Sequence, residues 1–258
     1  MSSFGVGRVS SLFVYPMSFD EFLTATGQEG LLRTKRNSSP TNPLPEAFYN
    51  RLVEAFRSYM LVGGMLEAVA TYTETGSYRY SSDIVSEIIQ GYQDDFAKYG
   101  AKANPLLLRQ TLISVAHQAG AKFVYSRVEG QYRSAEVKVA LEMLKDAGLI
   151  IPTYHTDANG VPLGAEINER VVKYLIHDTG VLLGILGIDD DIDDSIKEMM
   201  VADSINLVDK GHVAEMMAGL ELIKYSSPQK RHQLYYWQNM NKGTCAEVDY
   251  VIARSGSI

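Results

Sequence analysis

Apolar positions recur at helical spacing through most of the first hundred residues. A short strand is expected first, over 12–15, and Pro16 ends it. Ser18 and Glu21 then have the three-residue spacing of a capping box, which predicts the start of a helix. Residues 34–45 contain three prolines and several small polar side chains, so we expect a loop there.

Further helices are expected after this loop. Pro45 suits the first turn of a helix with an apolar face at helical spacing. That face consists of Phe48, Leu52, Ala55, Phe56 and Tyr59. Gly63 and Gly64 interrupt the pattern, a second helical stretch follows, and a third covers 81–98. The segment 16–100 is therefore expected to be helical.

The segment 101–170 has the element order of a winged helix-turn-helix. Two helices are expected from apolar faces at helical spacing, and a short helix lies between them. The first face consists of Leu108, Thr111, Leu112 and Val115, and the second of Val137, Ala140, Leu141 and Leu144. Gly148 is placed to cap the second helix. The β-prone runs 149–154 and 161–167 then flank an Asn-Gly turn signal at 157–160, which predicts a hairpin.

The segment 171–258 is expected to form a small α/β unit. A strand over 171–177 precedes an apolar helix around 178–187, and a long helical region follows. Two strands, 234–237 and 246–252, complete the unit. The predicted fold class for the whole chain is therefore α+β.

The composition excludes several classes of protein. Of the 258 residues, 46% are hydrophobic and 21% are charged, which excludes a chain that is disordered throughout. The longest apolar run, 181–188, is interrupted by Gly184 and Gly187 and is too short to span a bilayer. The single cysteine, Cys245, cannot form an internal disulfide. We therefore expect a cytoplasmic protein with no membrane partner.

Charge and motifs exclude several functions for this chain on its own. The formal net charge is −7, and only the segment 101–170 avoids a negative balance, so charge does not indicate a nucleic-acid binder. The sequence lacks the phosphate loop G-x-x-x-x-G-K-[ST], the dinucleotide motif G-x-G-x-x-G and the nucleophile motif G-x-S-x-G. Its five histidines are too dispersed for a zinc site. We expect no ATP hydrolysis and no cofactor for this chain by itself.

The last expected strand has two carboxylates on one face. Strict alternation puts Glu247 and Asp249 about 7 Å apart on the same side, where their oxygens suit Mg²⁺. Aspartate is depleted in strands, so Asp249 between Val248 and Tyr250 needs an explanation. The alternative is an edge strand whose solvent face is kept charged to prevent aggregation.

Glu215 lies in the preceding helix and points away from its apolar stripe. The stripe consists of Val213, Met216, Met217 and Leu220. One interpretation of Glu215 is a solvated carboxylate on the helix surface. The other is a metal ligand that meets the two strand carboxylates.

The second helix of the winged-helix segment contains candidates for DNA contact, namely Arg133, Ser134 and Lys138. Acidic residues on the same exposed surface would weaken contact with phosphates; they are Glu136, Glu142 and Asp146. We therefore favour a structural or protein-facing winged helix over one that binds DNA.

Six stretches of the sequence match a known family in their order along the chain. They are YPMSFDEFL (15–23), YMLVGGMLEAV (59–69), QDDFAKYG (93–100), LEMLKDAGLI (141–150), KYLIHDTGVLLGILG (173–187) and LYYWQNMNKGTCAEVDYVI (234–252). On these stretches the chain resembles the C-terminal region of a microbial family of AAA-type ATPases, in which a nucleotide-binding domain precedes a domain of unknown function. The resemblance implies that residues 1–15 are the end of the ATPase domain, with Arg8 as a nucleotide-sensing arginine.

The C-terminal part of that family resembles the PD-(D/E)XK nuclease fold. The resemblance implies a helix glutamate at Glu215 and a strand aspartate at Asp249, with Glu247 as an assisting or metal-binding carboxylate. The E-x-K pair of the fold is expected just past Ile258, so residues 171–258 would be a truncated nuclease-like domain.

Three functional hypotheses follow. The first is an accessory region of an AAA-type ATPase that recognises nucleic acid or a partner, with ATP and Mg²⁺ bound by the full-length protein. The second is a Mg²⁺-dependent nuclease once the missing strand is present. The third is a protein-interaction module. Oligomerisation is compatible with all three.

Overall fold

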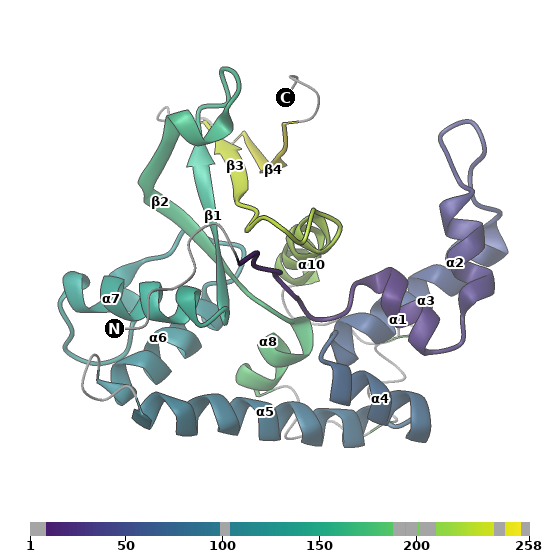
Figure 1. Cartoon of the computed structure of the whole chain (residues 1–258), viewed down its shortest axis with the longest axis horizontal. Helices are drawn as coiled ribbons and strands as arrows, with labels where there is room; N and C mark the ends of the chain where they lie inside the picture. The colour runs from purple at the N-terminus through teal and green to yellow at the C-terminus, as the bar shows by residue number, and fades with distance from the viewer. Residues whose placement is uncertain are drawn as a thin grey trace.

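The computed structural model describes residues 9–98, 104–187, 194, 201, 210–239 and 246–253. Over these residues the chain is an α+β protein in which a group of helices adjoins a four-stranded mixed sheet (Figure 1). The fold class is therefore as predicted. Within the described residues, every helix is too short or too polar to cross a membrane.

The helical part comes mostly from the first half of the chain. Its helices are α1 (Phe19–Ala25), α2 (Glu29–Arg36), α3 (Glu46–Val62), α4 (Leu66–Thr75), α5 (Tyr78–Lys98), α6 (Pro105–His117) and α7 (Ser134–Asp146), followed later by α8 (Thr179–Ile185) and α10 (Lys210–Lys224). The predicted capping box is present at α1, where the Ser18 amide donates to the Glu21 carboxylate at 2.7 Å. Gly148 has a φ of +78° just after α7, as its predicted capping role requires.

A buried aspartate joins α3 to α8. Gly63 ends α3 with a φ of +77°, and the next amide, of Gly64, donates to Asp178 Oδ2 at 2.6 Å. The other carboxylate oxygen of Asp178 accepts from the Val181 amide at 3.1 Å, so the same side chain caps α8. Only 1% of Asp178 is exposed.

A second buried network holds α10 against the N-terminal segment. Glu221 accepts hydrogen bonds from the Phe19 amide at 3.1 Å and the Tyr59 hydroxyl at 2.9 Å. Lys224 donates to the Met17 carbonyl at 3.0 Å and to the Tyr59 hydroxyl at 2.7 Å. Burial lowers the pKa of Lys224, and the nearby Glu221 opposes that shift. These contacts fix the position of the helix that contains Glu215.

The sheet has the strand order β2-β1-β3-β4. Its strands are β1 (Ile150–Thr156), β2 (Ile167–Ile176), β3 (Leu234–Gln238) and β4 (Glu247–Val251). β1 is antiparallel to β2 and parallel to β3, and β4 is antiparallel to β3. In this sheet β4 is an edge strand, as the interpretation of its carboxylates as a protection against aggregation assumes.

Helices cover both faces of the sheet (Figure 1). On one face, Tyr174 of β2 contacts Phe123 edge-to-face, with ring centroids 5.5 Å apart, beside α6 and α7. On the other face, Leu175 lies against Gly219 of α10. Because both faces are covered, β2 is buried continuously from Val171 to Ile176.

Several expected elements differ in the structure. Residues 12–15 form no strand; Phe13 makes one backbone hydrogen bond, to Pro228, and lacks a ladder partner among the described residues. The expected strand 161–167 is wrong as well, because residues 163–166 form a 3₁₀ turn whose Leu163 carbonyl accepts from Thr156 Oγ1. The strand begins at Ile167 instead and continues without a break across 170 and 171, where a domain boundary was expected.

Candidate metal centre

A row of polar side chains crosses the face of the sheet that α10 covers. From β2 to β4 it consists of Lys173, Thr153, His155, Tyr236, Glu247 and Asp249, and Glu215 reaches it from α10. Lys173 lies directly opposite Thr153, and His155 is paired with Tyr236. Cross-strand partners share a face of a sheet, so the row is a consequence of strand register.

Lys173 is the buried cation of this row. Only 4% of it is exposed, and its Nζ lies 2.8 Å from a Glu215 oxygen and 2.5 Å from a Glu247 oxygen. Nζ also lies 5.0 Å from the centre of the Tyr236 ring. Burial acts to lower the pKa of Lys173, but the hydrogen bonds to Glu215 and Glu247 outweigh it, and the pKa is raised above its ordinary value.

Glu215, Glu247 and Asp249 form what we call the carboxylate cluster. Each offers one oxygen atom, and these atoms all lie within 4.8 Å of one another. The Glu215 side chain is only 11% exposed and that of Glu247 is 29% exposed. The interpretation of Glu215 as a solvated carboxylate is therefore wrong, because its position on α10 turns it toward the sheet and Lys173.

An extra residue in β4 brings the carboxylate cluster together. Tyr235 pairs with Val251 and Trp237 with Val248, so Asp249 and Tyr250 together oppose Tyr236. This is the pattern of a β-bulge, and it breaks the strict alternation expected from the sequence. Tyr250 consequently reaches α10, where its hydroxyl donates to the Glu215 carbonyl at 2.8 Å. Asp249 is near Glu215 through the same bulge.

The cluster has more negative charge than Lys173 neutralises. Among the described residues, Lys173 is the cation that pairs with it, so three carboxylates face one ammonium group. Burial raises the pKa of Glu215, Lys173 opposes the shift, and the charges on Asp249 and Glu247 add to it. A divalent cation bound by carboxylate oxygens would relieve this repulsion, and oxygen ligands are those that Mg²⁺ and Ca²⁺ take.

Unpaired polar atoms lie beneath the cluster. Tyr236 is fully buried, and its hydroxyl has no hydrogen-bond partner within the described part of the chain. Thr153 Oγ1 and His155 Nδ1 are likewise buried without a described partner. Burial first, and then the charges of Glu247 and Glu215, raise the pKa of Tyr236 to about 12, which places its hydroxyl in the field of the cluster. Buried polar groups of this kind normally bind water or a ligand.

A glycine in α10 sets the distance between the helix and β4. A Cβ atom at Gly219 would lie 2.4 Å from the Tyr250 hydroxyl and 2.8 Å from Leu175 Cδ1. We expect Gly219→Ala to lower the free energy of unfolding by about 1–3 kcal/mol, because the side chains of Tyr250 and Leu175 must shift. Thermal unfolding measures this loss.

Gly211→Ala in the same helix is the matched control. Nothing lies within 4 Å of a Cβ at Gly211, so alanine there should stabilise the helix by up to about 1 kcal/mol. Equal effects of the two substitutions would contradict the close packing of Tyr250 against Gly219.

The structure brings together some of the residues chosen from the sequence and not others. Glu215, Glu247 and Asp249 meet in one cluster. Arg133, Ser134 and Lys138 are exposed at the start of α7, distant in the sequence from the cluster. Arg8 lies outside the described residues.

Sequence reasoning missed Lys173. The sequence contained a signal for it: Lys173 is the one charged residue in the run VVKYLI, whose other five residues are apolar or aromatic. A lysine at the centre of a strand buried on both faces requires a carboxylate partner.

Comparisons with known proteins give a family and no relative of known function. A model of the family described as a domain of unknown function (DUF8612) matches residues 53–192, more than half of the chain. The match starts within α3 and includes β1 and β2, and therefore Lys173, but it ends before the carboxylate cluster. No curated protein and no solved structure matches the chain.

Proposed function

The chain belongs to the family of the domain of unknown function DUF8612, and we propose that it is a nuclease-like region that binds a divalent cation at the carboxylate cluster. The observation that supports this proposal is the convergence of three carboxylate oxygens within 4.8 Å beside a buried lysine. The orphaned Tyr236 hydroxyl in the same field is independent support for a ligand at this place.

The roles of the residues follow from their positions. Glu215, Glu247 and Asp249 would hold the cation, of which Mg²⁺ is the expected one, and it would supply charge neutralisation and water activation. Lys173 has its ammonium group between two of the carboxylates, where it can donate a hydrogen bond to a water molecule or to a phosphate oxygen. We propose that Lys173, on β2, takes the place of the lysine expected beyond Ile258.

The wider context is a second part of the proposal. The order α6, a 3₁₀ turn at Tyr125–Arg127, α7 and the β1–β2 pair is consistent with a winged helix fused to the cluster-bearing strands. Together with the resemblance to AAA-type ATPases, this order supports an accessory region that acts on nucleic acid, with ATP bound by a nucleotide-binding domain of the same polypeptide.

Titration calorimetry with Mn²⁺ and Mg²⁺ tests the metal site directly. We expect the chain to bind Mn²⁺, and Asp249→Asn to weaken that binding by about tenfold or more, because a charged carboxylate ligand is replaced by a neutral amide. Asp83→Asn, an exposed aspartate on α5, is the matched control and should leave the affinity unchanged.

Cleavage of single-stranded and duplex DNA with Mg²⁺ then tests the reaction. Cleavage that disappears in Asp249→Asn and is kept in Asp83→Asn supports the nuclease. Metal binding without cleavage of either substrate would support the cation site and overturn the proposed nuclease activity. Absence of Mn²⁺ binding would overturn the cation site and the nuclease activity together.

A further inference from the structure

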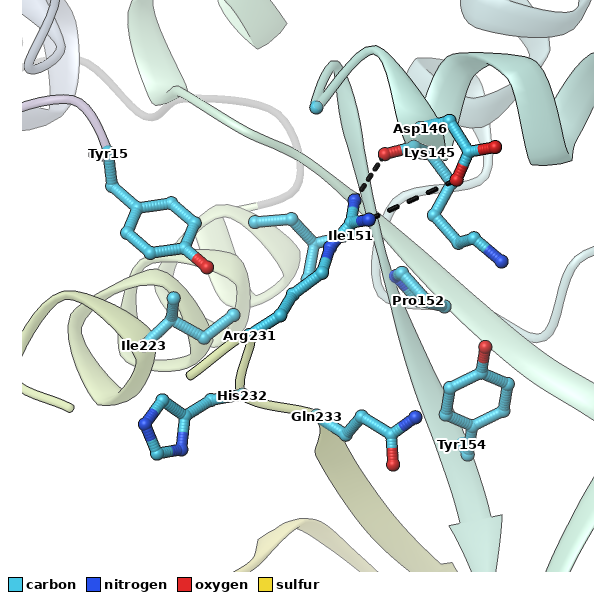
Figure 2. A pocket seen from close by; sticks show the side chains of 11 residues that line it. Tyr15, Lys145, Asp146, Ile151, Pro152, Tyr154, Ile223, Arg231, His232 and Gln233 are labelled. Atoms are coloured by element: carbon cyan, nitrogen blue, oxygen red, sulfur yellow. Dashed lines mark hydrogen bonds and ion pairs between the residues drawn. The ribbon is translucent and has the colours of Figure 1, made fainter. Parts of the chain in front are cut away.

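A pocket of about 330 Å³ opens beside the first residues of β1 (Figure 2). β3 joins β1 only from Leu234, which pairs with Thr153, so the start of β1 has no neighbouring strand on that side in the described sheet. Residues 231–233 and Tyr15 of the N-terminal segment line the resulting gap. Its volume is in the range of sites that bind small ligands.

Two cations lie at this pocket. Arg231 Nη2 donates to the Lys145 carbonyl at the end of α7, and Nη1 lies 3.9 Å from Asp146 Oδ1. The Lys145 ammonium group pairs with Glu142. The side chains of Asp146 and Glu142 are 73% and 61% exposed, so these are weak surface ion pairs. An incoming phosphate can therefore displace both acids, because arginine binds phosphate through two parallel hydrogen bonds.

Two half-buried tyrosines flank the arginine. Figure 2 shows the Arg231 side chain between Tyr15 and Tyr154. Burial raises the pKa of both hydroxyls, and the charge of Arg231 acts against the shift at each of them. The positive charge of Arg231 therefore acts on a tyrosine hydroxyl on each side of the pocket. Aromatic rings beside a cation suit a planar base next to its phosphate.

Other groups complete a surface with both polar and apolar parts. His232 and Gln233 come from the same linker as Arg231 and offer an imidazole and an amide. Ile151, Pro152 and Ile223 provide the apolar part of the lining. An apolar lining with a few converging polar groups is the usual composition of a ligand pocket.

We propose that this pocket binds the phosphate group of a nucleotide unit, with Arg231 and Lys145 as the phosphate ligands and Tyr15 or Tyr154 against the base. The pocket is separate from the carboxylate cluster, because Glu215, Glu247 and Asp249 are not among the residues that line it. The inference therefore does not require the metal centre.

Fluorescence anisotropy with a labelled short single strand of DNA, in EDTA, tests the pocket while metal is removed. We expect binding that weakens by about tenfold in Arg231→Gln and in Lys145→Gln, because a charge-assisted hydrogen bond is lost. The Lys145 substitution keeps the backbone carbonyl that holds Arg231. Arg51→Gln makes the same charge change on the exposed surface of α3, away from the lining residues, and should have little effect.

Competition separates the two sources of phosphate. Displacement of the labelled strand by AMP shows that a free nucleotide is sufficient, and a lack of displacement shows that the pocket needs a nucleic-acid backbone; either supports the proposal. Absence of binding, or equal losses in Arg231→Gln and Arg51→Gln, overturns it. Because EDTA is present throughout, failure here leaves the metal-dependent proposal unaffected.

Discussion

Lys173→Met is expected to lower the free energy of unfolding by about 3–5 kcal/mol at neutral pH, because it leaves a buried carboxylate without its cation. Glu215 is 11% exposed and loses its 2.8 Å ion pair, and Glu247 loses its own at 2.5 Å. Lys138→Met, on the exposed surface of α7, removes the same charge without a buried partner and should cost little. Denaturant unfolding at several pH values measures both losses.

The pH dependence identifies the origin of this loss. The pKa of Lys173 is raised above 10.5 in the folded chain, so its stabilisation is present below that pH and is lost as the pH rises through the folded value. Burial already raises the pKa of Glu215, and without Lys173 to oppose that shift Glu215 accepts a proton as the pH falls, so the deficit should be smaller at pH 5 than at pH 8. A deficit independent of pH would show that lost packing, and not charge, is the cause.

A double variant isolates the ion pair. Lys173→Met combined with Glu215→Gln removes the buried cation and one of its anions together, so most of the stability should return. Divalent cations should also stabilise Lys173→Met more than the wild-type chain, since the carboxylate cluster then lacks its internal cation. No recovery in the double variant would contradict the assignment of the loss to the Lys173–Glu215 pair.

Gly63→Ala is expected to destabilise the chain by about 3–5 kcal/mol, through backbone strain and the loss of hydrogen bonds to Asp178. A Cβ at Gly63 would lie 2.2 Å from Asp178 Oδ1 and 2.8 Å from the Gly180 amide nitrogen. Asp178 must then move, and the amides of Gly64 and Val181 lose their acceptor. Thermal or denaturant unfolding measures the change.

Gly76→Ala separates the cost of backbone strain from the cost of the steric clash with Asp178. Gly76 has a similar φ, +67°, but nothing lies within 4 Å of a Cβ placed there. Its substitution should therefore cost only the left-handed backbone penalty, about 1 kcal/mol. If the two variants were equally stable, the contact between the end of α3 and Asp178 would not contribute to stability.

Local signals in the sequence predicted much of the helical part and the fold class. The Ser18–Glu21 capping box and Gly148 interact with residues only a few positions away, so the local sequence is sufficient to predict their roles. The same holds for α6 and α7, whose apolar faces recur at helical spacing. Local rules failed where a tertiary contact decides the outcome, as at residues 12–15, which lack a strand partner among the described residues.

The candidate site was only partly predictable for the same reason. Glu247 and Asp249 were identified by their unusual presence in a strand, but the bulge opposite Tyr236 depends on how β4 registers with β3. Lys173 is separated from Glu215 by 42 positions, so its role depends on α10 packing over β2. Pattern analysis identified the two strand carboxylates as unusual, and the assembled sheet shows that they meet Glu215 and Lys173.

The parallel pairing of β1 with β3 also determines when the site can exist during folding. The β1–β2 pair closes a short loop, whereas Thr153 meets Leu234 only after about 80 residues of chain have been brought together, at a higher cost in chain entropy. We expect Lys173 to contact water until α10 and β4 bring Glu215 and Glu247 to it. The ion pairs of Lys173 with Glu215 and Glu247 are therefore expected to form late in folding, when the native topology is complete.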